Sequence, residues 1–152
     1  MTKRIIFILT LLLVATYSCK QSQDVVSFDS FGVQPNTNEN ASLAAVKLVE
    51  HLIANESDQH VTVVFPKGRY DFYEDGSFQR EYYISNHDQT NPKSVGFALE
   101  DLQNITIDGQ GSDFIFHGRM VPFALLNNAN ITLKNVNIDF EVPALRQLKV
   151  VE

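Results

Sequence analysis

Two matching stretches near the C-terminal end constrain the fold more than any other feature of the sequence. Each begins with Asn-Ile-Thr, at Asn104 and at Asn130, and then alternates apolar with polar residues, which is the two-residue period of a β-strand. The two starts lie 26 residues apart. Because repeats of roughly 20 to 50 residues indicate stacked supersecondary units, the sequence predicts an all-β fold, a right-handed parallel β-helix whose coils cover one another's apolar faces.

The corners of such coils need left-handed or bridging backbone dihedrals. Gly and Asn adopt these conformations at the lowest steric cost. We expect them at six residues near the predicted strand ends: Asn104, Gly109, Gly111, Asn127, Asn128 and Asn130.

The first 19 residues read as a secretory signal peptide. Lys3 and Arg4 form a positive start, and the apolar run from Ile5 to Val14 is shorter than the roughly 20 residues that a membrane span needs. The segment ends at Cys19 and resembles a bacterial lipoprotein signal, in which the enzyme that lipidates Cys cuts just before it. Cys19 is the only cysteine, so an intramolecular disulfide is excluded and a lipid anchor is its expected use.

This reading divides the chain into three parts. Residues 1–19 form the signal peptide, 20–27 a polar tether, and 28–152 the cap and first coils of a longer β-helix. The protein is then exported and anchored by lipid in a bacterial outer membrane or periplasm. An incidental cysteine in a cleaved leader is the alternative.

Composition and charge indicate a globular chain and bear on its expected partners. Hydrophobic residues make up 44% of the chain and charged residues 20%, which is globular rather than disordered. Removing Lys3 and Arg4 with the leader leaves 10 basic residues against 18 acidic ones, so the formal charge moves from −6 to −8. Nucleic acid is therefore not an expected partner, whereas neutral glycans tolerate an acidic surface.

The segment before the repeats predicts a helix followed by short strands. An apolar stripe at spacings of three and four predicts an amphipathic helix over Ala41–Asn55, capped by Asn38 or Asn40 and able to cover the open end of the first coil. The stripe consists of Leu43, Val46, Val49, Leu52 and Ile53. Strands are expected at residues 61–65, 69–73, 78–85 and 95–99, with a turn at Asp75-Gly76.

The best polar constellation is a run of four residues that we interpret as a candidate substrate-binding loop. Asn86, His87, Asp88 and Gln89 together offer the donors and acceptors that sugar hydroxyls use. The alternative is a turn in which the Asn and Asp side chains bond their own backbone.

The remaining candidates have structural alternatives. Carboxylates at coil corners commonly accept hydrogen bonds from backbone amides, which we favour over an acid role for Asp101, Asp108 and Asp113. Asp139 and Glu141 share one face of the last strand, where one of two close carboxylates can have a raised pKa, although a solvated face is the alternative. Four tyrosines offer stacking surfaces for sugars or close the core: Tyr70, Tyr73, Tyr82 and Tyr83.

Two histidines carry no predicted function. His51 is expected at the surface near the helix end, and His117 has no predicted partner. The sequence contains no metal-ligand spacing, phosphate-binding loop or nucleophile motif, so no cofactor or metal is expected.

Several strings resemble a known enzyme family. The helix followed by residues 61–70 is similar to the opening of the pectate-lyase-like β-helix superfamily. Residues 28–33, 80–89, 105–118 and 138–143 are similar to the N-terminal region of the exo-acting α-1,3-galactosidases of glycoside hydrolase family 110. The resemblance covers nearly all of residues 28–152, and the string Tyr82–Gln89 is its most specific part.

The resemblance implies an exported enzyme that removes terminal α-1,3-linked galactose, as on blood group B glycans, with inversion. Inversion requires an acid and a base carboxyl group roughly 6.5–9.5 Å apart. In the family these aspartates lie on later coils, so no catalytic residue is assigned to this chain. The alternatives are a glycan-binding β-helix without chemistry, a polysaccharide lyase, which would need more basic residues, and an inactive truncated product.

Overall fold

The computed structural model describes residues 24–55, 59–83 and 91–142. The predicted signal peptide with Cys19 and the string Asn86–Gln89 lie outside these residues. Within them the protein is mostly β, with much of its strand pairing parallel and a single α-helix, α2 (Ser42–Ala54), which confirms the predicted fold class at that level. None of the helices in these ranges has the length and apolar character that crossing a bilayer demands.

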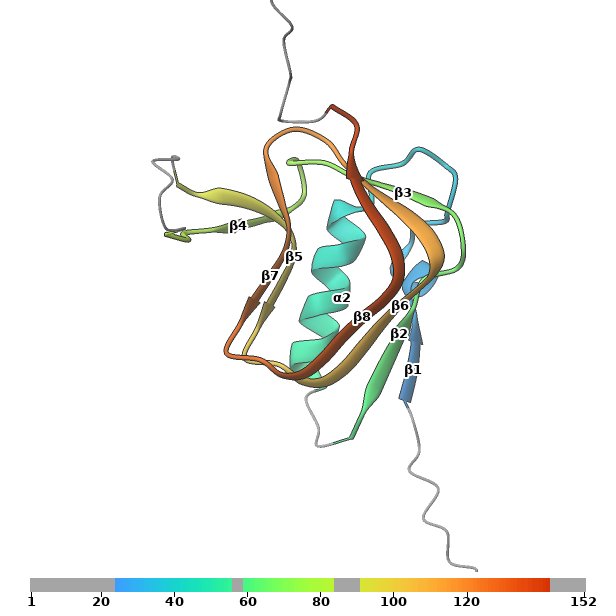
Figure 1. Ribbon diagram of the computed structural model, residues 1–152, viewed down its shortest axis with the longest axis vertical. Helices are drawn as coiled ribbons and strands as arrows, with labels where there is room; N and C mark the ends of the chain where they lie inside the picture. The colour runs from blue at the N-terminus through green and yellow to red at the C-terminus, as the bar shows by residue number, and fades with distance from the viewer. Residues whose placement is uncertain (1–23, 56–58, 84–90, 143–152) are drawn as a thin grey trace, which may run out of the picture.

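One five-stranded sheet is built around a single long strand, β6 (Gln103–Phe116). Strands β2 (Val61–Val64) and β3 (Arg69–Phe72) pair in parallel with its first and second halves along one edge. Strand β8 (Ala129–Phe140) pairs in parallel along the whole length of the other edge, as Figure 1 shows. The strands predicted from the repeat and from residues 61–65 and 69–73 are therefore confirmed.

The repeat is preserved in the register of β6 and β8. Ile105 lies opposite Ile131, and Asn130 Nδ2 donates to Asn104 Oδ1 at 2.8 Å across a separation of 26 residues. Pairing breaks after Asp108, which lies opposite Lys134, and resumes where Ser112 lies opposite Val136. Strand β6 thus has three residues at this corner where β8 has one, and the later rungs pair residues 24 apart.

A second, three-stranded sheet lies across from the first. Strand β5 (Lys93–Glu100) pairs in parallel with β7 (Met120–Leu126), and Ser94 lies opposite Met120. Strand β4 (Phe78–Arg80) pairs antiparallel with the first residues of β5, and this end of the sheet projects away from the body of the molecule (Figure 1). The expected strand at residues 78–85 is shorter in the structure, and its last two residues lie outside the described ranges.

The core between the two sheets is aromatic. Rings from successive strands stack on one another, as between Phe97 and Phe123, whose centroids lie 4.7 Å apart, and between Phe72 and Phe116 at 5.0 Å. Full burial of one such side chain stabilises the fold by roughly 1.5–3 kcal/mol. The largest fully buried rings are Phe28, Phe65, Tyr70, Phe72, Phe97, Phe114 and Phe116.

Helix α2 packs on this core and lies between the β5–β7 side and the β2–β6–β8 side in Figure 1. The helix is confirmed, but the predicted stripe is wrong in part: Leu43 and Ile53 are 53% and 51% exposed. The buried face instead contains Ala44, Ala45, Leu48, Val49 and Leu52. The two alanines let the helix approach the strands closely, and this rotates the outer leucine and isoleucine into solvent.

The start of α2 is tied to the sheet by polar contacts. The N-cap position is Ala41 and not Asn38 or Asn40 as predicted, but Asn40 Oδ1, one residue earlier, accepts a hydrogen bond from the backbone N–H of Ser42 at 2.9 Å. The Ser42 hydroxyl donates to the Tyr73 carbonyl at 2.7 Å and accepts from the Tyr73 N–H at 2.8 Å. The helix is therefore fixed to the end of β3 in position and in rotation.

Four of the predicted corners have positive φ: Asn104, Gly111, Asn127 and Asn130. Gly109 and Asn128 are not among the residues with positive φ, and each serves another purpose. A Cβ at Gly109 would lie 2.6 Å from the carbonyl oxygen of Asn135, so close approach of two strands requires glycine there. The Asn128 side chain bridges the backbone, accepting from Leu102 N–H and donating to the Leu99 carbonyl, both at 2.8 Å.

The last four residues of the segment predicted as a polar tether form a strand instead. Residues Asp24–Ser27 form strand β1, which pairs in parallel with β2. Val25 and Val26 give this segment the β-branched character that suits an edge strand.

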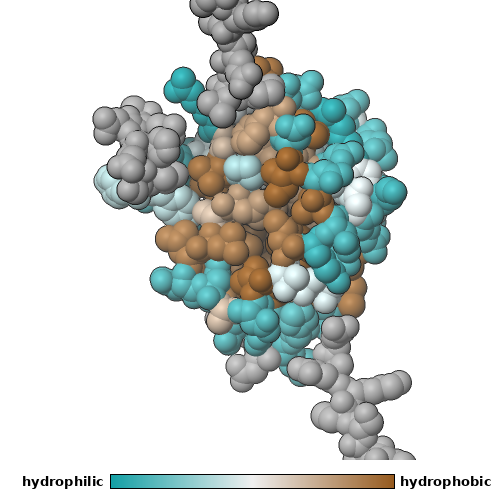
Figure 2. Space-filling view, in the orientation of Figure 1, coloured by the Kyte–Doolittle hydropathy of each residue, from teal (hydrophilic) through white to brown (hydrophobic). Residues whose placement is uncertain are grey.

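The outer edge of β7 and β8 exposes apolar side chains. Figure 2 shows apolar surface gathered at the centre of this face, surrounded by polar surface. Among the described residues no further strand pairs with β8 on this edge. The exposed large apolar side chains on these two strands are Leu125, Leu126, Leu133 and Ile138.

Two matched leucine substitutions on α2 test its observed orientation. Leu48→Ala removes a fully buried side chain and should lower the free energy of unfolding by about 2–5 kcal/mol. Leu43→Ala, five residues earlier on the exposed side, should lower it by about 0.5 kcal/mol or less. Urea unfolding of the 152-residue chain measures both. Equal losses would contradict the orientation.

Candidate functional site

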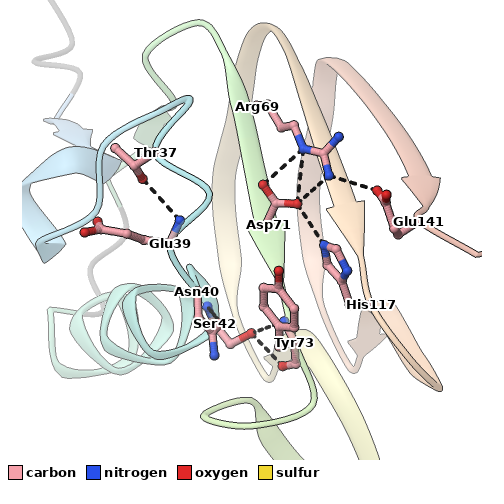
Figure 3. A network of polar contacts seen from close by, with 9 residues as sticks. All are labelled: Thr37, Glu39, Asn40, Ser42, Arg69, Asp71, Tyr73, His117 and Glu141. Atoms are coloured by element: carbon pink, nitrogen blue, oxygen red, sulfur yellow. Dashed lines mark hydrogen bonds and ion pairs between the residues drawn. The ribbon is translucent and has the colours of Figure 1, made fainter.

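A network of charged side chains lies on β3, on the face opposite the core (Figure 3). Tyr70 and Phe72 point inward, so the alternation of a strand places Arg69 and Asp71 on the other face. Arg69 Nη2 donates to Asp71 Oδ1 at 2.7 Å, and Arg69 Nε lies 3.1 Å from both Asp71 oxygens. His117 Nε2 lies 2.8 Å from the same Oδ1.

The network extends to the end of β8. Arg69 Nη2 also donates to Glu141 Oε2 at 2.9 Å, just beyond the last residue of that strand. The Arg69 guanidinium therefore joins β3 to Glu141 at the end of β8. Asp71 joins β3 to His117, the residue after β6.

The electrostatics of this network favour the ionised form of Asp71. Its side chain is only 3% exposed, and burial alone would raise its pKa. Hydrogen bonds from Arg69 and His117, together with their charges, outweigh burial and lower the pKa of Asp71 below its ordinary value. The hydrogen bonds with Asp71 and then Glu141 raise the pKa of Arg69, so the guanidinium stays charged.

His117 has the partners that the sequence did not reveal. Besides Asp71, its ring stacks on Tyr73 with centroids 4.0 Å apart and an interplanar angle of 9°. These contacts follow from the pairing of β3 with β6, in which Arg69 lies opposite Asp113 and Phe72 lies opposite Phe116, the residue before His117. Sequence alone does not give that register.

The geometry of the network indicates a structural clamp. Both oxygens of Asp71 already accept hydrogen bonds, and Arg69 and Glu141 are paired with each other. The network holds the ends of neighbouring strands together.

The predicted corner carboxylates are also engaged in structure. Asp108 Oδ1 accepts from the Asn135 side chain at 2.9 Å and from the Gln110 backbone at 3.0 Å, and these bonds lower its pKa. Asp113 accepts from the Asn137 side chain at 2.9 Å, and Asp101 occupies a corner with φ of 55°. Asp108 accepts the expected hydrogen bond from a backbone amide, whereas Asp113 accepts from a side chain and Asp101 is placed at a corner by its backbone conformation.

The pair on the last strand has separate partners. Glu141 binds Arg69, whereas Asp139 Oδ1 accepts from the N–H of Phe140 at 2.8 Å. Asp139 lies opposite Ile115, and Asp108 lies opposite Lys134, so these two carboxylates do not face each other on β6 and β8.

A cleft of about 410 Å³ opens between the residues that follow β4 and strand β7. Its wall is partly aromatic and contains one carboxylate. The lining consists of Glu81, Tyr82, Tyr83, Val121, Phe123, Ala124 and Leu126. The candidate string Asn86–Gln89 follows Tyr83 closely in the chain and lies outside the described residues, so its predicted role stays a prediction.

The aromatic wall of the cleft is held in place by Glu100 on β5. The Tyr82 hydroxyl donates to Glu100 Oε1 at 2.6 Å, and Arg80 Nε donates to Glu100 Oε2 at 3.1 Å. Burial, and then the hydrogen bond with Glu100, raise the pKa of Tyr82 to about 12. Burial alone would raise the pKa of Glu100, but the bonds from Tyr82 and Arg80 lower it.

The four predicted tyrosines serve different purposes. Tyr70 is buried and donates to the Pro66 carbonyl at 2.7 Å, which makes it a core residue. Tyr73 stacks on His117, and only Tyr82 and Tyr83 line the cleft. His51 is exposed and lies at the end of α2, as expected, within 3.2 Å of the Asn55 side chain. The described part of the chain holds no cluster of potential metal ligands.

The sequence is similar to enzymes over nearly all of its length. It is 48% identical over 150 residues to an alpha-1,3-galactosidase B of Phocaeicola vulgatus, covering 98% of this chain and 25% of that protein. The corresponding Bacteroides fragilis protein is 50% identical over 151 residues, which cover 97% of this chain and 25% of that protein. An alpha-1,3-galactosidase A of Shewanella woodyi is 41% identical over 118 residues, or 78% and 19% of the two chains.

This chain is therefore homologous to alpha-1,3-galactosidases, which confirms the relationship that the sequence strings predict. The chain spans about a quarter of the length of the Phocaeicola vulgatus and Bacteroides fragilis proteins. No family model matches the sequence.

The charged clamp makes a prediction about stability and pH. Asp71→Asn should lower the free energy of unfolding at pH 7 by about 1–3 kcal/mol, because charge-assisted hydrogen bonds to Arg69 and His117 are lost. The lowered pKa of Asp71 means that its contribution is present above the unfolded-state pKa of about 4 and is lost as the pH falls through the folded-state pKa. The variant should therefore lose less stability on acidification than the wild type does.

Urea unfolding between pH 7 and pH 3 measures this difference. The matched control is Asp139→Asn on the exposed face of β8, which should change stability by about 0.5 kcal/mol or less. If Asp71→Asn and Asp139→Asn behaved alike at both ends of the pH range, the clamp would not contribute to stability.

Proposed function

We propose that this chain forms the N-terminal section of an exported α-1,3-galactosidase. The enzyme would remove terminal α-1,3-linked galactose from glycans such as those of blood group B, with inversion at the anomeric carbon. The observation that carries the proposal is an identity of 48–50% to enzymes of that name over 97–98% of this chain.

The proposed architecture is the opening of a right-handed parallel β-helix, with α2 as its cap. The support is a common step in both sheets: Ile105 lies opposite Ile131 in one, and Ser94 opposite Met120 in the other. A shared step of 26 residues is what one full coil stacked on the next would produce. The exposed apolar edge of β7 and β8 would then receive the following coil.

The catalytic carboxylates are proposed to lie outside this chain. Inversion needs an acid and a base with a water between them. Asp71, Asp108 and Glu141 are engaged in hydrogen bonds or ion pairs that hold strands together. The acid and base would then come from the part of the enzyme that this chain does not match.

Export and anchoring complete the proposal. Residues 1–19 have the form of a lipoprotein signal, and Cys19 would carry the lipid after cleavage. The enzyme would then act on glycans from a bacterial outer membrane or periplasm. A glycan-binding protein without chemistry is the second candidate, and the aromatic cleft beside β7 favours it.

A chimeric enzyme tests the proposed function. The matching quarter of the Bacteroides fragilis enzyme is replaced by this chain, and galactose released from the disaccharide Galα1-3Gal is measured. We expect release at a rate within an order of magnitude of the parent enzyme, because the replaced section supplies scaffold and not the catalytic pair. The same enzyme with that quarter deleted is the control. A folded, monodisperse chimera that released no more galactose than the deletion would refute the proposal.

Substitution of the lone cysteine tests the anchor. Cells that express the wild-type chain with radiolabelled palmitate should incorporate label into it, and the protein should partition into detergent. Cys19→Ser should abolish the label, because the chain contains no second thiol. Label that persisted in Cys19→Ser would show that the anchor is wrongly assigned.

A further inference from the structure

We propose that the capped end of the fold, meaning strand β1 together with the outer side of helix α2, rests on a zwitterionic lipid surface, that of the bilayer to which Cys19 is anchored. The coils would then stack away from the membrane. The inference rests on the proposed anchoring of the chain and adds the face of the protein that meets the membrane.

Strand β1 and helix α2 lie at the end of the stack opposite to β8. In the five-stranded sheet β1 is the terminal strand beside β2, whereas β8 pairs with the far edge of β6. Asn40, two residues before α2, forms a parallel bridge with Asp71 on β3. A short 3₁₀ helix, η1 (Phe28–Phe31), follows β1, and the Phe31 ring meets the His51 ring of α2 edge-on at 5.7 Å between centroids. The capped end is therefore one layer of the fold.

The capped end exposes apolar side chains that the core does not use. Leu43 and Ile53 on α2 are 53% and 51% exposed, and Val25 on β1 is 60% exposed. The opposite side of α2 packs on the core, so the two helix residues face outward. Among the described residues no strand pairs with the outer edge of β1. The next coil of the proposed β-helix would cover β7 and β8 and leave this face free.

The length of chain between Cys19 and β1 holds the membrane close to the capped end. Only residues 20–23 separate Cys19 from Asp24, the first residue of β1. Five residues in a fully extended chain span at most about 18 Å. Each further coil would add about 4.8 Å on the side away from β1, so the capped end stays nearest to the anchor. Confinement within this distance raises the effective concentration of the face at the bilayer, and weak contacts then suffice.

The charges of the capped end indicate which headgroups it can meet. Asp24, Glu39 and Glu50 are exposed on β1, just before α2 and on α2, and the exposed lysine of the helix is Lys47. Anionic headgroups repel a face on which carboxylates are in excess. Zwitterionic headgroups such as those of phosphatidylethanolamine and phosphatidylcholine carry no net charge and allow the apolar side chains to reach the interface.

Tryptophan fluorescence of the anchored protein tests this face. The chain contains no tryptophan and one cysteine. The mature form that begins at Cys19 is coupled through this thiol to a maleimide lipid in phosphatidylcholine vesicles, some of whose headgroups carry a nitroxide quencher. Leu43→Trp should lose fluorescence, because the outer side of α2 meets the headgroups. Asp139→Trp on the exposed face of β8 is the matched control and should keep its fluorescence.

Two further variants decide between the ends of the stack and test the contact itself. Leu133→Trp lies on the apolar edge of β8, and stronger quenching there than in Leu43→Trp would overturn the proposal. Adding Ile53→Asp to Leu43→Trp should reduce the quenching. Unchanged quenching would mean that the tether alone holds the face near the bilayer, and would refute contact through α2. Because both α2 positions are exposed, urea unfolding should stay close to that of the wild type.

The lipid composition tests the assigned headgroup. Vesicles that contain phosphatidylglycerol at low salt should quench Leu43→Trp less than phosphatidylcholine vesicles do, because the face and the lipid then carry charge of the same sign. Stronger quenching by the anionic vesicles would overturn the zwitterionic assignment.

The outcomes separate the membrane-facing surface from the proposed function. Chemical coupling takes the place of the native lipid, so the result does not depend on lipidation of Cys19 in cells. An active chimeric galactosidase together with equal quenching of Leu43→Trp and Asp139→Trp would overturn the surface and leave the galactosidase standing. Selective quenching of Leu43→Trp together with an inactive chimera would support the surface and count against the galactosidase.

Discussion

The structure depends on one strand that is paired along both of its edges. β6 receives β2 and β3 in succession on one side and β8 on the other, all in parallel and in register. Because a slip of one residue would turn every side chain to the opposite face, this register sets the whole core. Ile105, Ile107, Phe114 and Phe116 point inward from it and are buried. The rings contributed by neighbouring strands stack on that row.

The polar features follow from the same register. Side-chain hydrogen bonds join β6 to β8 at three places: Asn130 donates to Asn104, Asn135 to Asp108 and Asn137 to Asp113. The clamp of Arg69, Asp71, His117 and Glu141 closes the ends of the same strands. These carboxylates thereby hold neighbouring strands together. The aromatic cleft lies on the other sheet, where Glu100 supports its wall.

The sequence predicted the helix, most of the strands and three of the left-handed asparagines, because a period of two, a period of 3.6 and a repeat can be read directly from the chain. The predicted stripe placed Leu43 and Ile53 on the buried face of the helix, but both are exposed. An apolar stripe does not show that the small residues Ala44 and Ala45 take the buried positions. His117 had no visible partner because Asp71 is 46 residues away and meets it only through the pairing of β3 with β6. The cleft was equally hidden, because Tyr83 and Phe123 come together only when β4 and β7 flank β5.

Hydrogen exchange of backbone amides tests the central role of β6 most directly. If β6 is paired on both edges, its amides outside the corner at residues 109–111 should exchange slowly, whether they point to β2 and β3 or to β8. In β8 of the 152-residue chain only every second amide, the one that points to β6, should be protected. Uniform protection of β8, or exchange in β6 as fast as in β8, would contradict the stacking on which the account rests.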